Sequence, residues 1–388
     1  MTNEATYWAA LAHLPNWGYG KINSLIVRFF HDEKMSIEDF FNLPPALWVD
    51  KFHLDPKDIS DLQKAKSDLP NNAFFVDNLI SQGYELIPIT SSDYSKVLKQ
   101  NLKSSHSPPL LYIKGNKKIL NERSVAIVGS RSAESISLEF TDNIARLASM
   151  NAKVVVSGFA KGVDKQALDS AIKYKGKSVI VLPQGITTFS SGFKAYYRQI
   201  VGGDVLVLST FPPKAIWSVG LAMARNPIIY GLAEEIYVAE SSEKGGTWAG
   251  VIDGLKKKRK IFVRQADENE RNANALLIQK GAIPVGLDGK ELENVQYNID
   301  IFEQPALVKE PEEQYQREDS LERKILSVFN GTALTAKEIL SKLNVELTSQ
   351  KLSGILRRLT QIEVIKEKNP HKFQLKNKFD GPQKTLFD

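Results

Sequence analysis

Seven short apolar runs follow one another through the middle of the chain, each of them three or four residues long. Runs this short, rich in Val and Ile, are typical of strands buried on both faces of a parallel sheet. Helix-like stretches such as 138–150 and 165–175 lie between several of them. The pattern therefore predicts an α/β fold in which parallel strands alternate with helices. The seven runs are 125–128, 154–156, 179–182, 205–208, 236–238, 261–263 and 283–285.

The residues before this sheet predict a second module. At 388 residues the chain suits two or three domains of the usual ~100–200 residues. Apolar residues at helical spacing indicate an all-helical module over 1–72. The sheet domain is then assigned to 73–302, with two further short strands expected at 84–89 and 110–113 beside the main sheet.

The C-terminal part predicts a third module. An acidic stretch that contains two prolines, 303–320, is expected to be a solvated linker. Beyond it, three amphipathic helices and two short strands predict a winged-helix domain over 321–378, followed by a tail, 379–388. The helices are expected at 321–329, 335–343 and 348–359, and the strands at 364–365 and 373–375. The winged-helix segment has 12 Lys and Arg against 5 Asp and Glu, an excess of +7, whereas the whole chain carries +6. Since the rest of the chain is about neutral, charge alone does not argue that the sheet domain binds DNA.

Composition excludes several kinds of chemistry. The chain has no cysteine and five scattered histidines, so we expect no disulfide, no thiolate zinc site, no metal and no cofactor. No run approaches the ~18 consecutive apolar residues of a membrane span, and the first residues do not resemble a secretory signal. We therefore expect a cytoplasmic protein without a membrane partner.

The first candidate site is a loop, Gly129-Ser130-Arg131, at the end of the 125–128 strand. A strand that runs through a glycine turn into a helix directs backbone N–H groups and the positive helix end toward an anion. Arg131 is expected to add a bidentate phosphate contact. The plain alternative is a tight turn with a surface arginine.

A second glycine loop, 157–164, follows the next strand. Gly158 and Gly162 lie four residues apart, where the backbone must approach a ligand closely, and Lys161 between them is the better phosphate contact. Asp164 more often caps the following helix in such a position. Because both loops follow parallel strands, we expect them at the carboxyl edge of one sheet.

Two later segments are expected to add contacts at the same edge. Arg225 and Asn226 put a cation and an amide before a helix-like run, and Gly245, Gly246 and Thr247 follow the 236–238 strand. The two glycines are equally compatible with an ordinary turn. The densest basic run, Lys256-Lys257-Lys258-Arg259-Lys260, lies between a helix and a strand, and we interpret it as solvated.

Taken in order, these segments resemble the DNA-processing protein A (DprA/Smf) family. The resemblance rests on 108–116, 125–131, 157–164, Arg225-Asn226 and 274–282. It implies a helical N-terminal module, an extended Rossmann-like domain and a winged helix. It also implies a homodimer that binds single-stranded DNA without catalysis and hands it to a RecA-type recombinase in natural transformation. Phosphates would be held by Arg131, Lys161 and Arg225, with backbone donors at Gly129, Ser130, Gly158 and Gly162.

The chain departs from the family pattern at several positions. Pro227 stands where the family has a second arginine after Arg-Asn, which removes one expected phosphate contact. Leu168 replaces a histidine, and the loop 186–192 lacks a tyrosine-proline signature. The resemblance is therefore to a diverged member.

Two other functions are compatible with the same residues. Gly245-Gly246-Thr247 resembles the turn of the lysine-decarboxylase-like nucleoside-phosphate hydrolases, which favours a nucleotide-binding sensor in a defence or regulatory system. That family's catalytic glutamate is absent from 248–251, so hydrolysis is less favoured than binding.

The other alternative is a duplex-DNA regulator acting through the winged helix. Its second and third helices would turn four side chains toward a groove and two toward phosphates, unless the module docks to protein instead. The groove residues would be Ser349, Gln350, Lys351 and Ser353, and the phosphate contacts would be Arg357 and Arg358.

Overall fold

The computed structural model describes residues 4–267 and 269–293, together with short pieces of the C-terminal part. Those pieces are 325, 328–329, 334–343, 349, 352, 356, 362–365 and 372–375. The chain divides into two compact units, Met1–Tyr297 with Lys384–Asp388, and Asn298–Gln383. The expected linker, 303–320, and tail, 379–388, lie outside the described residues. No helix in the described part of the chain is long and apolar enough to cross a membrane.

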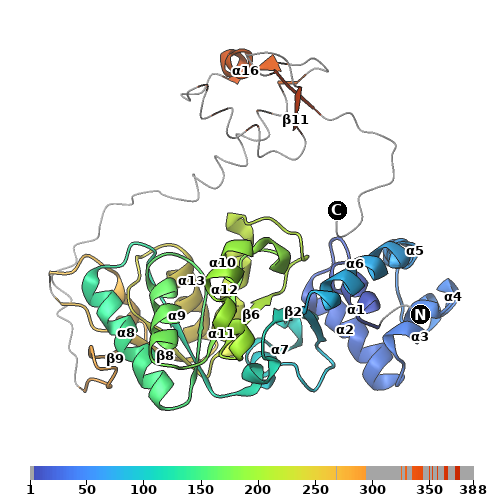
Figure 1. Ribbon diagram of the computed structural model, residues 1–388. Coiled ribbons are helices and arrows are strands. Elements are labelled where there is room, and N and C mark those ends of the chain that lie inside the picture. Colours follow the sequence, from blue (N-terminus) through green and yellow to red (C-terminus); the bar gives the residue numbers. More distant parts are fainter. Residues whose placement is uncertain are drawn as a thin grey trace. The chain divides into compact units, whose positions relative to one another are not determined.

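A mixed sheet forms the centre of the larger unit (Figure 1). Its order is β1-β2-β6-β5-β4-β3-β7-β8-β9. The seven strands predicted from apolar runs are all present and all parallel, which confirms the α/β fold. The two extra strands also form, but β1 pairs with β2, and β2 with β6, in antiparallel fashion. The strands are β1 Glu85–Pro88, β2 Leu110–Lys114, β3 Ser124–Val128, β4 Val154–Ser157, β5 Ser178–Val181, β6 Val205–Ser209, β7 Glu235–Val238, β8 Lys260–Arg264 and β9 Ile283–Val285.

Helices cover both faces of this sheet because successive strand residues point to opposite sides. Val125 and Ile127 of β3 belong to one core, with α8 and α9, while Ala126 and Val128 belong to the other, with α7, α12 and α13. All four side chains are buried, as the unbroken apolar runs require. The helices of this domain are α7 Lys96–His106, α8 Ser135–Met150, α9 Val163–Lys173, α10 Ser190–Ala195, α11 Tyr197–Gly202, α12 Val219–Leu232, α13 Gly246–Lys256 and α14 Asn274–Gln279; short 3-10 turns span Lys117–Asn121 and Ile186–Thr188.

The N-terminal helices gather at the end of the sheet where β1 and β2 lie (Figure 1). Their aromatic core, with Phe29, Phe40 and Trp48 fully buried, is continuous with Leu110 and Tyr112 of β2. The helical segment extends to Ser81, so the expected boundary at 72 falls inside α6. The elements are α1 Glu4–Ala12, α2 Tyr19–Ile26, a π-helical turn Val27–Asp32, α3 Ile37–Asn42, α4 Pro45–Asp50, α5 Pro56–Ser67 and α6 Leu69–Ser81.

The smaller unit contains one described helix and a three-stranded antiparallel sheet of order β10-β12-β11. Thr335 and Glu338 form a capping box at the start of the helix: the Thr335 N–H donates to the Glu338 carboxylate, and the Glu338 N–H donates to Thr335 Oγ1. Phe373 is buried with Ile339 and Leu352. The helix expected at 335–343 and the C-terminal strand pair are confirmed, while the winged helix as a whole stays a prediction. The elements are β10 Leu334–Thr335, α16 Ala336–Leu343, β11 Ile362–Ile365 and β12 Lys372–Leu375.

His13 of the helical module makes a polar contact with Tyr112 of the sheet. The His13 ring stacks on Tyr112 with centroids 5.7 Å apart, and His13 Nε2 lies 2.9 Å from the Tyr112 hydroxyl. Burial lowers the pKa of His13 from its usual 6.5 to about 4. The ring is therefore neutral at neutral pH, and protonating it in the folded state is unfavourable.

This lowered pKa predicts that acid weakens the fold. Below pH 6.5 the unfolded chain binds a proton on His13 that the folded chain excludes until about pH 4, so stability falls as pH falls through this window. We expect His13 to contribute a loss of up to about 2 kcal/mol between pH 7.5 and pH 5. Urea unfolding at the two pH values, compared with His13→Gln, measures it. An equal pH dependence in both proteins would contradict the assignment.

Candidate nucleic-acid interface

The two glycine loops lie side by side at one edge of the sheet. Strands β3 and β4 are parallel neighbours, so the loops that follow them open at the same carboxyl edge, as expected. The Val163 N–H donates to the Ser130 carbonyl over 3.2 Å. Gly162 has φ +76°, and a Cβ there would overlap the Ser130 and Arg131 carbonyl groups. Only glycine fits this contact, which fixes one loop against the other.

Two cations extend from these interlocked loops. Arg131 and Lys161 are both exposed, and neither forms an ion pair within the described residues. Arg131 lies close enough to Asp164 for its charge to lower the pKa of that carboxyl group. The two side chains thus offer positive charge to solvent from adjacent loops.

The N-terminal end of α8 is occupied by a carboxylate of the chain itself. Glu240 follows β7, the other neighbour of β3, and its Oε2 accepts from the Glu134 N–H at 3.0 Å and from Ser137 Oγ at 2.8 Å. The Glu240 carbonyl also accepts from the Ser130 N–H at 2.9 Å. A carboxylate at this position is favourable because it satisfies N–H groups and the helix dipole.

The contacts of Glu240 differ from the phosphate loop that the sequence predicted. Helix α8 begins at Ser135, not directly after Gly129-Ser130-Arg131, and the Ser130 N–H is already used. The Glu134 N–H at the N-cap of α8 and the Ser130 N–H therefore bind Glu240 and not an external anion. The sequence contained one signal for this role, a glutamate directly after a buried strand next to β3, but its partners are remote in sequence.

A buried network continues from Glu240 into the neighbouring loop. Arg264, 1% exposed, donates to Ser137 Oγ at 3.0 Å, to the Ala239 carbonyl at 3.0 Å and to the Glu270 carboxylate. Charged groups this deeply buried are stable only when paired and hydrogen-bonded. The network fixes the ends of β7 and β8 and the start of α8, and sequence reasoning did not identify it.

Asn274 adds hydrogen bonds to the same network. It is fully buried and accepts from the Ser241 N–H at 2.9 Å through Oδ1. Its Nδ2 donates to the Ala239 and Arg264 carbonyls at 3.0 and 2.8 Å. Because one amide side chain satisfies three backbone groups, it positions the ends of β7 and β8 beside the start of α14.

Arg225 is not a surface cation. It lies inside α12, which begins six residues earlier at Val219, and it is 4% exposed. Its Nη1 lies 3.7 Å from Asp164 Oδ2 and donates to the Val181 carbonyl at 3.3 Å. The guanidinium fills the space beside Gly158, where a Cβ would overlap it. The expected phosphate contact by Arg225 is therefore replaced by an internal ion pair.

Asp164 has a different role from the cap that its position suggested. Gly162 occupies the N-cap position of α9, and Asp164 lies in the first turn as the counter-ion of Arg225. Burial raises the pKa of Asp164, while Arg225 and Arg131 act to lower it. Burial also lowers the pKa of Arg225, and Asp164 acts to raise it. Each charge is thus tolerated in the interior only because the other is present.

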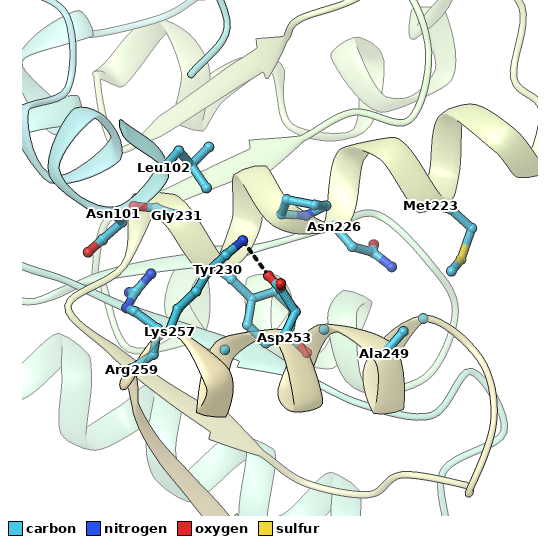
Figure 2. Close-up of a pocket in the computed structure, with 14 residues that line it drawn as sticks. Asn101, Leu102, Met223, Asn226, Tyr230, Gly231, Ala249, Asp253, Lys257 and Arg259 are labelled. Carbon is cyan, nitrogen blue, oxygen red and sulfur yellow. Dashed lines mark hydrogen bonds and ion pairs between the residues drawn. The ribbon is translucent and has the colours of Figure 1, made fainter. Parts of the chain in front are cut away.

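Asn226 and Gly246 belong to a separate cleft between α12 and α13 (Figure 2). The Asn226 amide lies where a Cβ on Gly246 would point, so this glycine permits close helix packing. Figure 2 shows Asp253 of α13 paired with Lys257, at 2.7 Å. No contact of Asn226 with the two glycine loops is recorded among the described residues.

The remaining predicted positions lie around α13 and in the C-terminal unit. Gly245, with φ +95°, is exposed at the N-cap of α13, and the Thr247 carbonyl accepts from the Tyr230 hydroxyl at 3.2 Å. Within the basic run, Lys257 is paired and Arg259 donates to the Ala233 carbonyl. Ser349 is helical and partly exposed. Gln350, Lys351, Ser353, Arg357 and Arg358 lie outside the described residues.

The buried ion pair gives a stability prediction. Arg225→Met leaves the Asp164 carboxylate buried without its counter-ion, which we expect to lower the free energy of unfolding by about 3–5 kcal/mol. In the double variant Arg225→Met/Asp164→Leu no charge is stranded, and we expect part of that loss to be recovered. Urea unfolding followed by circular dichroism measures both. A single variant as stable as the unmodified chain would show that the pair is not required.

The similarity to known proteins includes the sheet domain. A family model described as DNA recombination-mediator protein A matches residues 85–296, more than half of the chain. The DNA processing protein DprA of Bacillus subtilis (strain 168) is 28% identical over 205 residues, covering 52% of this chain and 68% of that protein. The DprA of Streptococcus pneumoniae is 31% identical over 156 residues, covering 40% of this chain and 55% of that protein.

A solved structure shows the same fold. The crystal structure of DNA processing protein A from Streptococcus pneumoniae aligns with a TM-score of 0.54 at 24% identity, covering 74% of this chain and 95% of that one. The family match and the curated relatives confirm the resemblance drawn from the glycine loops and the segments around them. The chain belongs to the DNA recombination-mediator protein A family, and its DNA-processing relatives place it among proteins of DNA recombination.

Proposed function

We propose that this protein is a non-catalytic single-stranded DNA-binding protein that protects the strand and loads a RecA-type recombinase onto it. The observation that carries the proposal is the pair of exposed cations, Arg131 and Lys161, on two interlocked loops at the carboxyl edge of the sheet, with no ion pair to either among the described residues. Side chains of this kind hold phosphates without reading sequence. Family membership supports the same role.

The state of the α8 N-terminus favours a strand over a nucleotide. In Rossmann-type folds a nucleotide phosphate binds at the first helix N-terminus after the glycine turn. Here Glu240 holds that place, and its negative charge repels a phosphate there. Phosphates would instead lie farther out, at Arg131 and Lys161, where a continuous backbone can pass. This argues against a nucleotide-binding sensor and against nucleoside-phosphate hydrolysis.

The C-terminal unit and a second copy of the chain complete the proposal. The three-stranded sheet, α16 and the basic composition of 321–378 support a winged helix that adds DNA contacts through Ser349 and the residues after it. A homodimer formed through the sheet domains would present two edges to one strand, and a RecA-type recombinase would be the recipient. Size-exclusion chromatography with light scattering and capture by purified recombinase test these two steps.

The proposal predicts salt-sensitive binding of oligo-dT, tighter than binding of duplex of equal length. Arg131→Ala and Lys161→Ala should each weaken binding about tenfold or more and reduce the slope of log affinity against log salt by ~0.7. Fluorescence anisotropy between ~50 and ~200 mM salt measures both. Lys256→Ala is the matched control, since this exposed lysine ends α13 at the opposite edge of the sheet. Binding that prefers duplex or ignores both loop variants would refute the proposal.

A nucleotide screen gives a separate prediction. Any ligand of the folded chain present at about 100 times its dissociation constant stabilises it by roughly 2.7 kcal/mol. Because Glu240 fills the α8 N-terminus, we expect mononucleotides and dinucleotides to leave the thermal unfolding midpoint unchanged. A nucleotide that raises the midpoint of this chain, and no longer does so in Arg131→Ala, would favour the sensor function instead.

A further inference from the structure

The loop between β6 and α12, residues 210–218, lies at the same sheet edge as the two cations. In the order β6-β5-β4-β3 it is two strands from the Lys161 loop and three from the Arg131 loop. At ~4.8 Å per strand these separations are about 10 and 14 Å. Along one DNA strand charges repeat every ~3.4 Å, so the three loops fall within the length of a few nucleotides.

This loop exposes a large aromatic side chain. Trp217 is 46% exposed and the preceding Ile216 is 75% exposed, whereas Trp8, Trp17 and Trp48 are at most 8% exposed in the helical core. A tryptophan normally buries most of its surface, so one left open beside a candidate binding site is an informative exception. No ring or hydrogen-bond contact of Trp217 is recorded within the described residues.

The loop is held firmly by hydrogen bonds. The Gly185 N–H donates to the Ala215 carbonyl at 2.8 Å, and the Thr187 N–H donates to the Pro213 carbonyl at 3.0 Å. Ser218 then caps α12 by accepting from the Leu221 N–H at 3.2 Å. Trp217 therefore lies between a hydrogen-bonded loop segment and the capped start of α12. An aromatic group ordered before binding loses little conformational freedom when a ligand stacks on it.

Helix α12 connects Trp217 physically to the cation loops. Its residue Arg225 packs against Gly158 and pairs with Asp164, so the helix is fixed to the loop that carries Lys161. Val219, the first residue of α12, lies six residues before Arg225, about 9 Å along the axis at 1.5 Å per residue. Contacts between α12 and the loop that carries Lys161 therefore hold Trp217 and Lys161 in a fixed arrangement.

We propose that Trp217 stacks on a base of the single strand whose phosphates are held by Arg131 and Lys161. The inference rests on the proposed function and adds what the cations cannot supply, a contact to the bases. Proteins that bind single strands without sequence preference combine a positive track with aromatic platforms, because every base has a stacking face. Duplex DNA keeps its bases stacked on one another, so this contact also selects single strands.

The test compares Trp217→Ala and Trp217→Phe with the unmodified full chain. On oligo-dT we expect Trp217→Ala to raise the dissociation constant by about 5- to 150-fold, and Trp217→Phe by less. The salt slope should stay unchanged, because stacking releases no counterions. Intrinsic tryptophan fluorescence should be quenched by oligo-dT in the unmodified chain and much less in Trp217→Phe. Met150→Ala is the control, an exposed apolar residue, 71% exposed, where α8 ends at the other sheet edge.

An abasic oligonucleotide of equal length isolates the base contact. It keeps the phosphates, so we expect Trp217→Ala and the unmodified chain to bind it equally. If the unmodified chain binds oligo-dT and Trp217→Ala binds it as tightly, the stacking inference is wrong and the proposed function survives. If the unmodified chain binds no oligo-dT, the proposed function itself fails. A Trp217→Ala variant that only changes the oligomeric state would show that the patch joins two copies, which also overturns the inference.

Discussion

A buried ion pair between Arg225 and Asp164 joins the elements on which the candidate interface is built. It connects α12 to the first turn of α9, and its guanidinium occupies the space that the missing side chain of Gly158 leaves. Neither charge is stable in the interior alone, because burial raises the pKa of Asp164 and lowers the pKa of Arg225, and both shifts favour the neutral form. The loop with Lys161 and the helix that follows Trp217 are therefore held in one arrangement by a contact that has no direct part in binding.

The polar groups of the candidate interface are of two kinds, those bonded within the protein and those exposed to solvent. The Glu134 N–H at the N-cap of α8 and the Ser130 N–H are satisfied internally by Glu240, whose carboxylate takes the place of an external anion. Arg131 and Lys161 remain directed to solvent. A ligand held only by side chains can slide or change register more easily than one fixed by a ring of N–H groups. This suits a long polyanion better than a single phosphate group.

The sequence predicted the sheet well because its strands carry their own signal. Strands β3 to β6 contain unbroken apolar runs and are buried on both faces, which is the environment that such runs indicate. The antiparallel direction of β2 was not predictable, because an apolar pattern is the same in either direction. Gly162 and Arg131 were correctly placed at one edge because parallel neighbours share their carboxyl ends.

Arg225 and Asp164 were misjudged for a physical reason. Arg225 was expected before the start of a helix-like run, yet α12 begins at Val219 and contains both Arg225 and Pro227. Whether a charged side chain faces solvent or a counter-ion depends on a partner 61 positions away, which one sequence does not reveal. Glu240 is the same case, since its partners, Glu134 and Ser137, lie more than 100 residues upstream.

The two departures from the expected set of cations change the balance of forces at this edge. Arg225 is internal, and Pro227 stands where a second arginine was expected, so fewer positive charges lie at this edge than the resemblance implied. Counterion release from two phosphates alone gives a weak and steeply salt-dependent complex. The exposed Trp217, in the loop directly before α12, would supply attraction that salt does not screen if it stacks on a base as proposed. If Trp217 stacks on a base as proposed, an edge with fewer cations would hold a single strand at salt concentrations where two cations alone would release it.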